Sequence, residues 1–396
     1  MNKILFICCP DSTHSISWIN QLNDSDFDVR VFSVYINNNK NLSYPEWKFP
    51  TYVMEPPRDK TRIKNKLLVY YLSRIIPIPI SRILIDKFGL KQKWLKKIIL
   101  NWKPDIIHSF PLNVGGKLAT RTLKSIKKDL WPRWVASSWG SDLFLGIEGE
   151  KREKDNIKYI LENCDGFFSD CNRDLNIAKN NGLNINDAKF SLSLPGTGGV
   201  DIELFKLIRE KNLKRNIILI PKAYEREHAN KIFPLLEAIK LIQDDLNQYE
   251  IHFLMCSDAV KKWINKFPSN LRSRCKTYDM ISQNEMFKLL GKTKLMISLS
   301  ISDGTPNVML EAMAAGALPI MHPLDSIKEW IKDGENGLLV NSLYPERIRD
   351  AIDRGLKDDS LFRSASKLNW KTISDRADSD KNKLLIIKKY VNLLEN

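Results

Sequence analysis

Two carboxylates stand eight positions apart in the stretch SISDGTPNVMLEAMAAGALPI, and a Gly-Thr-Pro turn follows the first of them. The apolar run before this stretch predicts a buried strand, and a helix is expected to begin near Asn307. The first amides of a helix lack internal partners and carry a partial positive charge, so amides at Thr305, Asn307 and Val308 would hold a phosphate. Glu311 would accept hydrogen bonds from a ribose, and Asp303 from a neighbouring sugar. The spacing therefore predicts a site for a sugar nucleotide.

The rest of the chain predicts a scaffold of two doubly wound α/β domains that would position these residues. The chain has 396 residues, of which 43% are hydrophobic and 28% charged, enough for two separate cores. Short β-branched runs alternate with helix-period runs, which is typical of parallel sheets covered on both faces. We expect a Rossmann-like domain at 1–205, a second at 206–377, and a C-terminal helix at 378–396 that packs back across the junction.

Ligands bind beyond the carboxyl ends of strands in such sheets, so residues just after each expected strand are site candidates. His14 follows the first strand, and SSWGSD follows the fourth with Trp139, Gly140 and Asp142. Trp139 would stack on a sugar ring or form part of the wall. His108, inside PDIIHSF, is interpreted as a buried strand-end histidine or, alternatively, as a group on the acceptor side.

The motifs resemble those of the family 4 retaining glycosyltransferases, which have the two-domain GT-B fold. The resemblance rests on the acid-x7-acid element with GTPNVMLEAMAAG, on GLLV downstream, and on LPGTGGVDIELF between the expected domains. It implies that Glu311 binds the ribose and that Asp303 binds the hydroxyls of the transferred sugar. Gly304, in the turn after Asp303, is a further donor-binding candidate. Lys222, which follows NIILIP, would contact the diphosphate. Either Arg226 or Lys231 would be the second diphosphate contact, and Lys231 is preferred because a helical run follows it.

The sequence departs from the family pattern in three places. The family's first acid is usually a glutamate, whereas Asp303 is one methylene shorter. Trp139 stands where many relatives have a histidine before the glycine. The first loop, CCPDSTH, lacks the paired glycines that approach the nucleotide sugar, and His14 is a candidate to line the site in their place.

The formal net charge of +15 is concentrated in the first domain. Residues 58–103 contain thirteen lysines or arginines against Asp59 and Asp86, interleaved with Ile, Leu, Tyr and Trp. Basic residues mixed with apolar ones suit an anionic lipid surface. The competing interpretations are two solvated amphipathic helices and nucleic acid, and no nucleic-acid-binding motif is present. We therefore expect a membrane-facing segment and no nucleic-acid partner.

Neither a metal nor another cofactor is expected. The DSD sequences at Asp24/Asp26 and Asp378/Asp380 are interpreted as turn and helix-cap residues, so Lys222 and helix amides would neutralise the leaving diphosphate. The six cysteines show no zinc spacing and are typical of a cytosolic protein.

Together these observations predict a cytoplasmic glycosyltransferase, peripheral at the inner face of the cell membrane. It would move a sugar from a nucleotide-sugar donor to a glycan acceptor, lipid-linked or membrane-associated, in bacterial surface polysaccharide or lipopolysaccharide synthesis. A dinucleotide-dependent oxidoreductase is disfavoured because no G-x-G-x-x-G follows a strand. A sugar-nucleotide 2-epimerase of the same fold and a non-catalytic sugar-nucleotide-binding relative are the alternatives.

Overall fold

The structure, a computed structural model, describes residues 1–10, 12–34, 49–53, 66–69, 89–184, 188–211 and 213–395. It divides into two compact units. Unit 1 comprises Met1–Gly198 with Lys381–Asn396, and unit 2 comprises Gly199–Asp380. The divisions thus lie at residues 198 and 380, whereas the sequence placed them at 205 and 377.

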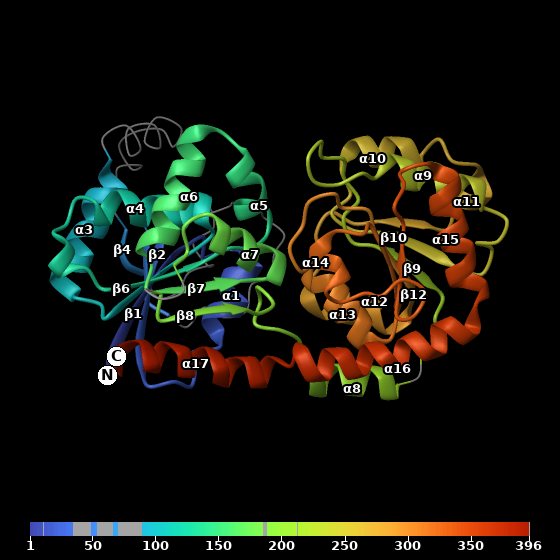
Figure 1. Cartoon of the computed structure of the whole chain (residues 1–396). Coiled ribbons are helices and arrows are strands. Elements are labelled where there is room, and N and C mark those ends of the chain that lie inside the picture. Colours follow the sequence, from blue (N-terminus) through green and yellow to red (C-terminus); the bar gives the residue numbers. More distant parts are fainter. Residues whose placement is uncertain are drawn as a thin grey trace. The chain divides into compact units, whose positions relative to one another are not determined.

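Unit 1 is built on a parallel sheet with the strand order β4–β3–β2–β1–β5–β6–β7–β8 (Figure 1). Its strands are β1 (Asn2–Cys8), β2 (Phe27–Ser33), β3 (Thr51–Val53), β4 (Lys66–Val69), β5 (Ile106–Ser109), β6 (Arg133–Ser137), β7 (Gly166–Ser169) and β8 (Phe190–Ser193). Its helices include α1 (Thr13–Asn20), α3 (Leu90–Trp102), α4 (Lys117–Leu123), α5 (Ser141–Glu148), α6 (Lys151–Asn163) and α7 (Asn172–Asn180). The single turns η2 (Leu112–Gly116) and η3 (Lys128–Leu130) lie on either side of α4.

Helices cover both faces of this sheet because successive side chains of a strand point to opposite faces. In β1, Leu5 and Ile7 join a core with α3, α4, α6 and α7. Ile4 and Phe6 join the opposite core, which includes α1 and the C-terminal helix α17 (Ser379–Glu395). Both faces of the strand are therefore buried, which explains its continuous apolar sequence.

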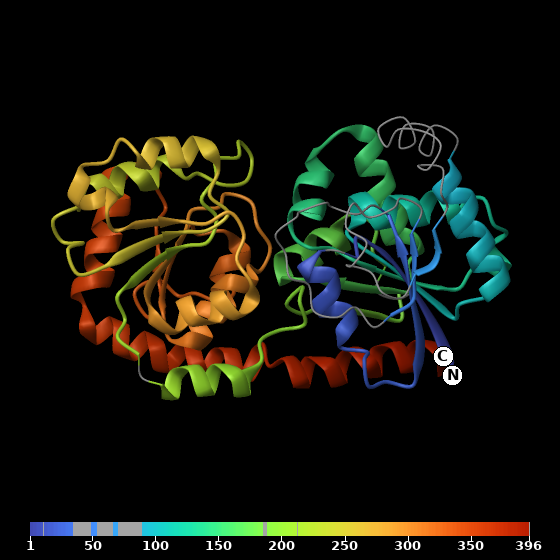
Figure 2. The ribbon, with the colours of Figure 1, turned by 180° about the vertical axis from the view of Figure 1, so that it is seen from behind.

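Unit 2 contains a second parallel sheet, with the order β11–β10–β9–β12–β13–β14. Its strands are β9 (Ile217–Ile220), β10 (Glu250–Phe253), β11 (Cys275–Thr277), β12 (Thr293–Ser298), β13 (Leu318–Met321) and β14 (Leu338–Leu339). Its helices are α8 (Ile202–Glu210), α9 (Phe233–Leu241), α10 (Asp258–Ile264), α11 (Ser269–Arg272), α12 (Gln283–Lys292), α13 (Asn307–Ala315), α14 (Asp325–Lys328), α15 (Pro345–Lys357) and α16 (Asp359–Arg376). Figure 2 shows the same helices from behind.

The core of unit 2 is divided by its sheet in the same way. Leu295 and Ile297 of β12 pack with α9, α10 and α15, whereas Met296 packs on the other face with α8 and α13. The two sheets with helices on both faces confirm the predicted doubly wound α/β fold. The short strands β3, β4 and β11 were not expected from the sequence.

Most of the basic segment at 58–103 lies outside the described residues. Residues 58–65 and 70–88 belong to that part, whereas 66–69 form β4 and residues 90–102 form α3. Among the residues that the structure describes, none of the helices combines the length and apolar character needed to cross a bilayer.

Candidate functional site

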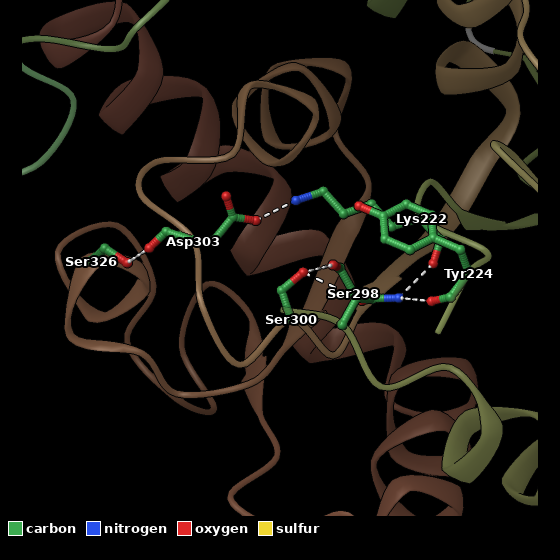
Figure 3. A network of polar contacts seen from close by, with 7 residues as sticks. Lys222, Tyr224, Ser298, Ser300, Asp303 and Ser326 are labelled. Carbon is green, nitrogen blue, oxygen red and sulfur yellow. Dashed lines mark hydrogen bonds and ion pairs between the residues drawn. The ribbon is translucent and has the colours of Figure 1, made fainter. Parts of the chain in front are cut away.

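The first two site candidates of unit 2 meet where neighbouring strands end. Lys222 follows β9 and Asp303 follows β12, and β9 and β12 pair in parallel, so both residues leave the sheet at its carboxyl edge. The Lys222 ammonium forms an ion pair and a hydrogen bond with the Asp303 carboxylate (Figure 3). About a quarter of the Lys222 side chain and a fifth of the Asp303 side chain remain exposed. The pair is thus accessible from solvent.

The environment keeps Lys222 charged. Burial alone would lower its pKa, but the attraction and hydrogen bond of Asp303 outweigh burial and raise the pKa above its ordinary value. A cation held in this way suits the negative charge of a diphosphate. A ligand that engages Lys222 must, however, compete with Asp303 for it.

A buried asparagine that the sequence did not single out fixes the Lys222 loop. The side-chain amide of Asn230 donates to the carbonyl of Lys222 (2.9 Å) and to that of Tyr224 (2.5 Å). Its oxygen accepts from Ser300 Oγ at 3.3 Å, so one side chain links the loop after β9 to the segment after β12. Figure 3 labels its partners Lys222, Tyr224 and Ser300. An Asn in a charged, loop-like stretch carries no local signal of this role, because its partners include a residue seventy positions away.

Two contacts hold the turn between β12 and α13. Ser326 Oγ donates to the Asp303 carbonyl at 2.9 Å, and Trp330 Nε1 donates to Thr305 Oγ1 at 3.2 Å. The Thr305 hydroxyl is therefore engaged inside the unit, which leaves its backbone as the part relevant to a phosphate. Gly304 is buried with the same turn.

Helix α13 begins at Asn307, as the sequence predicted. Pro306 occupies the position before it and has no side-chain acceptor to cap the first turn. The amides of Asn307 and Val308 precede the first hydrogen bond of the helix, which Met309 donates to the carbonyl of Pro306. These amides lie on the same short segment as Asp303, four and five residues after it.

Glu311 lies one helical turn beyond Asn307, on the same face of α13. Asn307 Nδ2 donates to Glu311 Oε1 at 2.9 Å. Burial raises the pKa of Glu311 to about 7, and the Asn307 hydrogen bond opposes this effect. Near neutral pH this carboxyl group is therefore close to the midpoint of its titration, so hydrogen-bond donors from a ligand would favour its ionised form.

The far end of α13 is held by two arginines. Arg215 and Arg209 donate to the carbonyls of Ala315 and Ala314, which end the helix. Gly316 follows with φ +91°, a conformation that side chains rarely tolerate. The cations complement the negative end of the helix dipole, so the position of α13 is fixed from both ends.

The two candidates for a second diphosphate cation differ in their surroundings. Lys231 lies two residues before Phe233, the first residue of α9. Its side chain is half-buried and forms an ion pair with Glu225 at 3.3 Å. Arg226 lies on the exposed part of the same loop, where its backbone pairs with Asn230. Both remain candidates, and engagement of Lys231 would require it to leave Glu225.

In unit 1, four of the predicted residues lie after β1 and β6. The His14 ring lies 5.3 Å from that of Trp139, and Trp139 lies 4.8 Å from Phe110. Asp142 accepts from the amides of Trp139 and Leu112, each at 2.7 Å. Gly140 has φ +85° immediately before α5, which explains the need for glycine there. Asp142 therefore connects the loop after β5 to the loop that carries Trp139.

His108 is a core residue of unit 1. It is fully buried in β5, with Nε2 2.6 Å from Ser137 Oγ and Nδ1 2.7 Å from the Tyr390 hydroxyl. Trp18 Nε1 donates to that hydroxyl at 3.1 Å. Burial lowers the pKa of His108 well below its ordinary value. The geometry favours a buried strand-end histidine, with both ring nitrogens hydrogen-bonded inside unit 1.

Among the described residues, one group of possible metal ligands lies together, at the carboxyl edge of β7. It consists of Asp170, Cys171 and Asp174. Arg173 pairs with Asp174 at 2.7 Å, so a guanidinium already offsets part of the negative charge of this group. The DSD residues have other roles: Asp24 pairs with Lys383, and Asp378 accepts from the amide of Asp380 near the start of α17.

Comparison with known proteins shows which class of protein part of unit 2 resembles. Residues 215–358, which contain Lys222, Asp303 and Glu311, match the model of the family described as Glycosyl transferases group 1. No curated protein matches the sequence. The match and the two sheets confirm the expected resemblance to glycosyltransferases of the GT-B fold.

Solved structures show the same fold over the whole chain. Sucrose-phosphate synthase from Thermosynechococcus elongatus is 14% identical, with a TM-score of 0.73 and full coverage of both chains. Anabaena HepE, in complex with UDP and glucose, is 12% identical with a TM-score of 0.67, covering 99% of this chain and all of that one. A glycosyltransferase from Rickettsia africae is 15% identical with a TM-score of 0.64, covering 100% of this chain and 99% of that one.

Proposed function

We propose that the protein is a retaining glycosyltransferase that takes a sugar from a nucleotide-sugar donor and passes it to a glycan acceptor. The observation that carries the proposal is the set formed by Lys222, Asp303, Glu311 and the first amides of α13 at one strand edge. The family match over 215–358 covers the same residues. The presence of UDP and glucose in the HepE structure supports a nucleotide sugar as the donor.

The donor would lie along the carboxyl edge of the sheet of unit 2. The Glu311 carboxylate accepts hydrogen bonds from the ribose, and Asp303 accepts hydrogen bonds from the sugar to be transferred. Between them, Lys222 and the amides of Asn307 and Val308 face the diphosphate. Lys231 or Arg226 supplies a second cation.

The reaction would proceed on one face of the sugar. The bond between the anomeric carbon and the phosphate oxygen breaks, and its electron pair leaves with the diphosphate. The acceptor oxygen bonds to the anomeric carbon from the same side, and its proton passes to the departing phosphate oxygen. Lys222 and the helix amides stabilise the charge that develops on the diphosphate. Under this scheme the residues named supply the electrostatic stabilisation, and we expect no metal requirement.

The proposal extends to the acceptor and its location. The basic, apolar composition of residues 58–103 supports an acceptor that is lipid-linked or membrane-associated, reached from the inner face of the cell membrane. Synthesis of a bacterial surface polysaccharide or lipopolysaccharide would require such an enzyme. In this scheme unit 1 binds the acceptor, with His14, Trp139, Gly140 and Asp142 at its carboxyl edge.

Thermal stabilisation by nucleotide sugars tests the donor site. A ligand that binds only the folded state stabilises it by about 2.7 kcal/mol at a concentration 100 times its Kd. We expect one class among UDP-, GDP-, ADP- and CMP-sugars to raise the Tm of the wild type, and Glu311→Ala to lose most of that shift. Glu210→Ala removes an exposed carboxylate on α8 and is the matched control, which should show the same Tm shift as the wild type. Equal stabilisation of Glu311→Ala and wild type, or no stabilisation by any donor, would refute the proposal.

A further inference from the structure

Helices α3 and α4 carry cations almost without carboxylates. Residues 89–104 and 112–131 contain only one acidic residue, Asp129. The cations of these two segments, which we call the α3/α4 face, are Lys91, Lys93, Lys96, Lys97, Lys103, Lys117, Arg121, Lys124, Lys127 and Lys128. Half of them lie in α4 and the residues around it, outside the segment 58–103 that the composition singled out.

The two helices lie side by side on the same face of the sheet (Figure 1). Gln92 Nε2 donates to the carbonyl of Arg121 at 2.8 Å, and Lys96 Nζ donates to the carbonyl of Ser125 at 2.6 Å. Their apolar residues, such as Ile98 and Leu123, are buried in the core beneath. The cations of both helices therefore contribute to one continuous outer surface.

Much of this charge is available to a partner. The exposed cations are Lys93, Lys97, Lys103, Arg121, Lys124, Lys127 and Lys128. Within the described residues, none of them forms an ion pair with a carboxylate. The face ends at α6, which mixes both signs of charge and where Lys124 lies 3.8 Å from the centre of the Tyr159 ring. The positive surface is thus dense, and it is bounded on the side of α6.

An exposed leucine stands among the cations. Leu130, at the end of η3, is 55% exposed and directly follows Lys127, Lys128 and Asp129. The next residue, Trp131, is half-buried and donates from Nε1 to the carbonyl of Ile126 at 3.1 Å, which anchors the turn that presents the leucine. Contacts with phosphates alone require no such apolar side chain, whereas a bilayer rewards its insertion.

We propose that the α3/α4 face, with Leu130, is the surface by which unit 1 binds an anionic lipid bilayer. The cations supply coulombic attraction to acidic headgroups, and Leu130 enters the boundary between headgroups and acyl chains. The inference deepens the proposed function, on which it rests for the need to reach a lipid-linked acceptor. It places half of the contact on α4 and η3.

Cosedimentation of the full chain with vesicles tests this surface. The vesicles contain phosphatidylcholine alone or phosphatidylcholine with phosphatidylglycerol. The test variant combines Lys93→Gln, Arg121→Gln and Lys127→Gln, all exposed side chains. Each cation near an anionic surface contributes about fivefold to affinity, so the triple variant should bind the acidic vesicles about a hundredfold more weakly. Arg363→Gln, Lys367→Gln and Lys371→Gln, exposed cations on α16, form the matched control and should bind like the wild type.

Leu130→Ser separates the apolar contribution from the charge. Loss of its insertion should weaken binding about fivefold, and the loss should persist at about 1 M salt, where exposed charges are screened. The matched change on α16 is Leu368→Ser, at a leucine that is 40% exposed, and it should have no effect.

Three results would overturn the inference. The first is a wild type that shows no binding to acidic vesicles, and the second is a triple variant that binds them like the wild type. The third is a short RNA that displaces the wild type from acidic vesicles at the same salt. Stabilisation by the donor is measured on the same variants. If the triple variant no longer binds acidic vesicles but is still stabilised by the donor, both proposals stand. If no donor stabilises any variant while vesicle binding behaves as predicted, only the proposed function fails.

Discussion

Glu311 shows how a single side chain links the position of a helix to ligand chemistry. Its carboxyl group is largely removed from water, is bonded to Asn307, and titrates near neutral pH. A ribose that donates two hydroxyl hydrogen bonds would replace lost water contacts and stabilise the ionised form. Donor binding should therefore be coupled to release of a proton from this residue.

This coupling predicts that donor affinity rises with pH. The pKa of Glu311 is about 7 in the protein without ligand, and a nucleotide sugar has no phosphate group that titrates nearby. Binding to the ionised form should make the apparent Kd about tenfold weaker at pH 6 than at pH 8. Isothermal titration calorimetry with the donor that stabilises the protein measures the apparent Kd at each pH. Glu311→Gln should show weak binding that does not depend on pH. A wild-type Kd that does not change over this range would contradict the account.

Lys222 should affect turnover more than donor binding. Removal of one preorganised group that stabilises developing charge typically lowers kcat by about a hundredfold to a thousandfold. We expect Lys222→Met to show this loss and Lys222→Arg, which keeps the charge, a smaller one. Release of nucleoside diphosphate is the measurement, and Lys206→Met, at an exposed lysine on α8, is the control. Wild-type kcat in Lys222→Met would remove Lys222 from the mechanism.

At this scale, spacing along the chain could identify only part of the site. Asp303, Asn307 and Glu311 lie within nine residues, so a turn and a helix suffice to bring them together. Lys222 was predicted from the family resemblance, as the basic residue after NIILIP, and the structure adds that its strand β9 pairs with β12. Asn230 was not found because its role depends on a loop folding back onto the segment after β12.

At the scale of elements, helix α17 completes the core of unit 1. Ile386, Tyr390 and Leu393 are buried with β1, β2 and α1. Since Trp18 donates to the Tyr390 hydroxyl, the hydroxyl proton is directed to His108 Nδ1, which leaves His108 Nε2 to donate to Ser137. A chain of hydrogen bonds thus joins the C-terminal helix to two central strands.

We predict that Tyr390→Phe destabilises unit 1. The change leaves the buried groups of His108 and Trp18 without their shared partner, and a buried unsatisfied group costs about 1–3 kcal/mol. Urea unfolding followed by tryptophan fluorescence should show a lower midpoint. Tyr344→Phe, in unit 2, is the control because that side chain is 74% exposed. An unchanged midpoint in Tyr390→Phe would show that the network contributes nothing to stability.

The same network gives stability a pH dependence. Burial holds the pKa of His108 below its ordinary value of 6.5, so the unfolded chain takes up a proton there before the folded one. The stability contributed by neutral His108 is present above about pH 6.5 and declines as the pH falls below it.

The sequence predicted the strands that are continuous apolar runs and missed short strands such as β3 and β11. Buried parallel strands such as β1 and β12 are continuous apolar runs, which have a strong local signal. β3 and β11 have three residues each, and β11 is polar and lies at the sheet edge. Such strands form because a neighbouring strand offers free backbone groups, which local sequence does not encode.

At the scale of the whole molecule, two sheets of similar construction carry different residues at their carboxyl edges. Unit 2 offers a cation, carboxylates and helix amides, which suit a diphosphate between two sugars. Unit 1 offers the ring pair of His14 and Trp139 and, on its flank, the α3/α4 face. In the proposed function this division assigns the donor to unit 2 and the acceptor and the membrane to unit 1.

The most direct test of glycosyl transfer is proton NMR of the stabilising nucleotide sugar, incubated with the protein alone so that water serves as the acceptor. The account predicts slow release of nucleoside diphosphate, with the free sugar first appearing in the anomeric configuration of the donor and with release by Lys222→Met at least about a hundredfold slower. An intact donor, or a sugar that first appears with the opposite configuration, would contradict it. Conversion of the donor to a nucleotide sugar epimeric at carbon 2 would contradict it too and identify an isomerase.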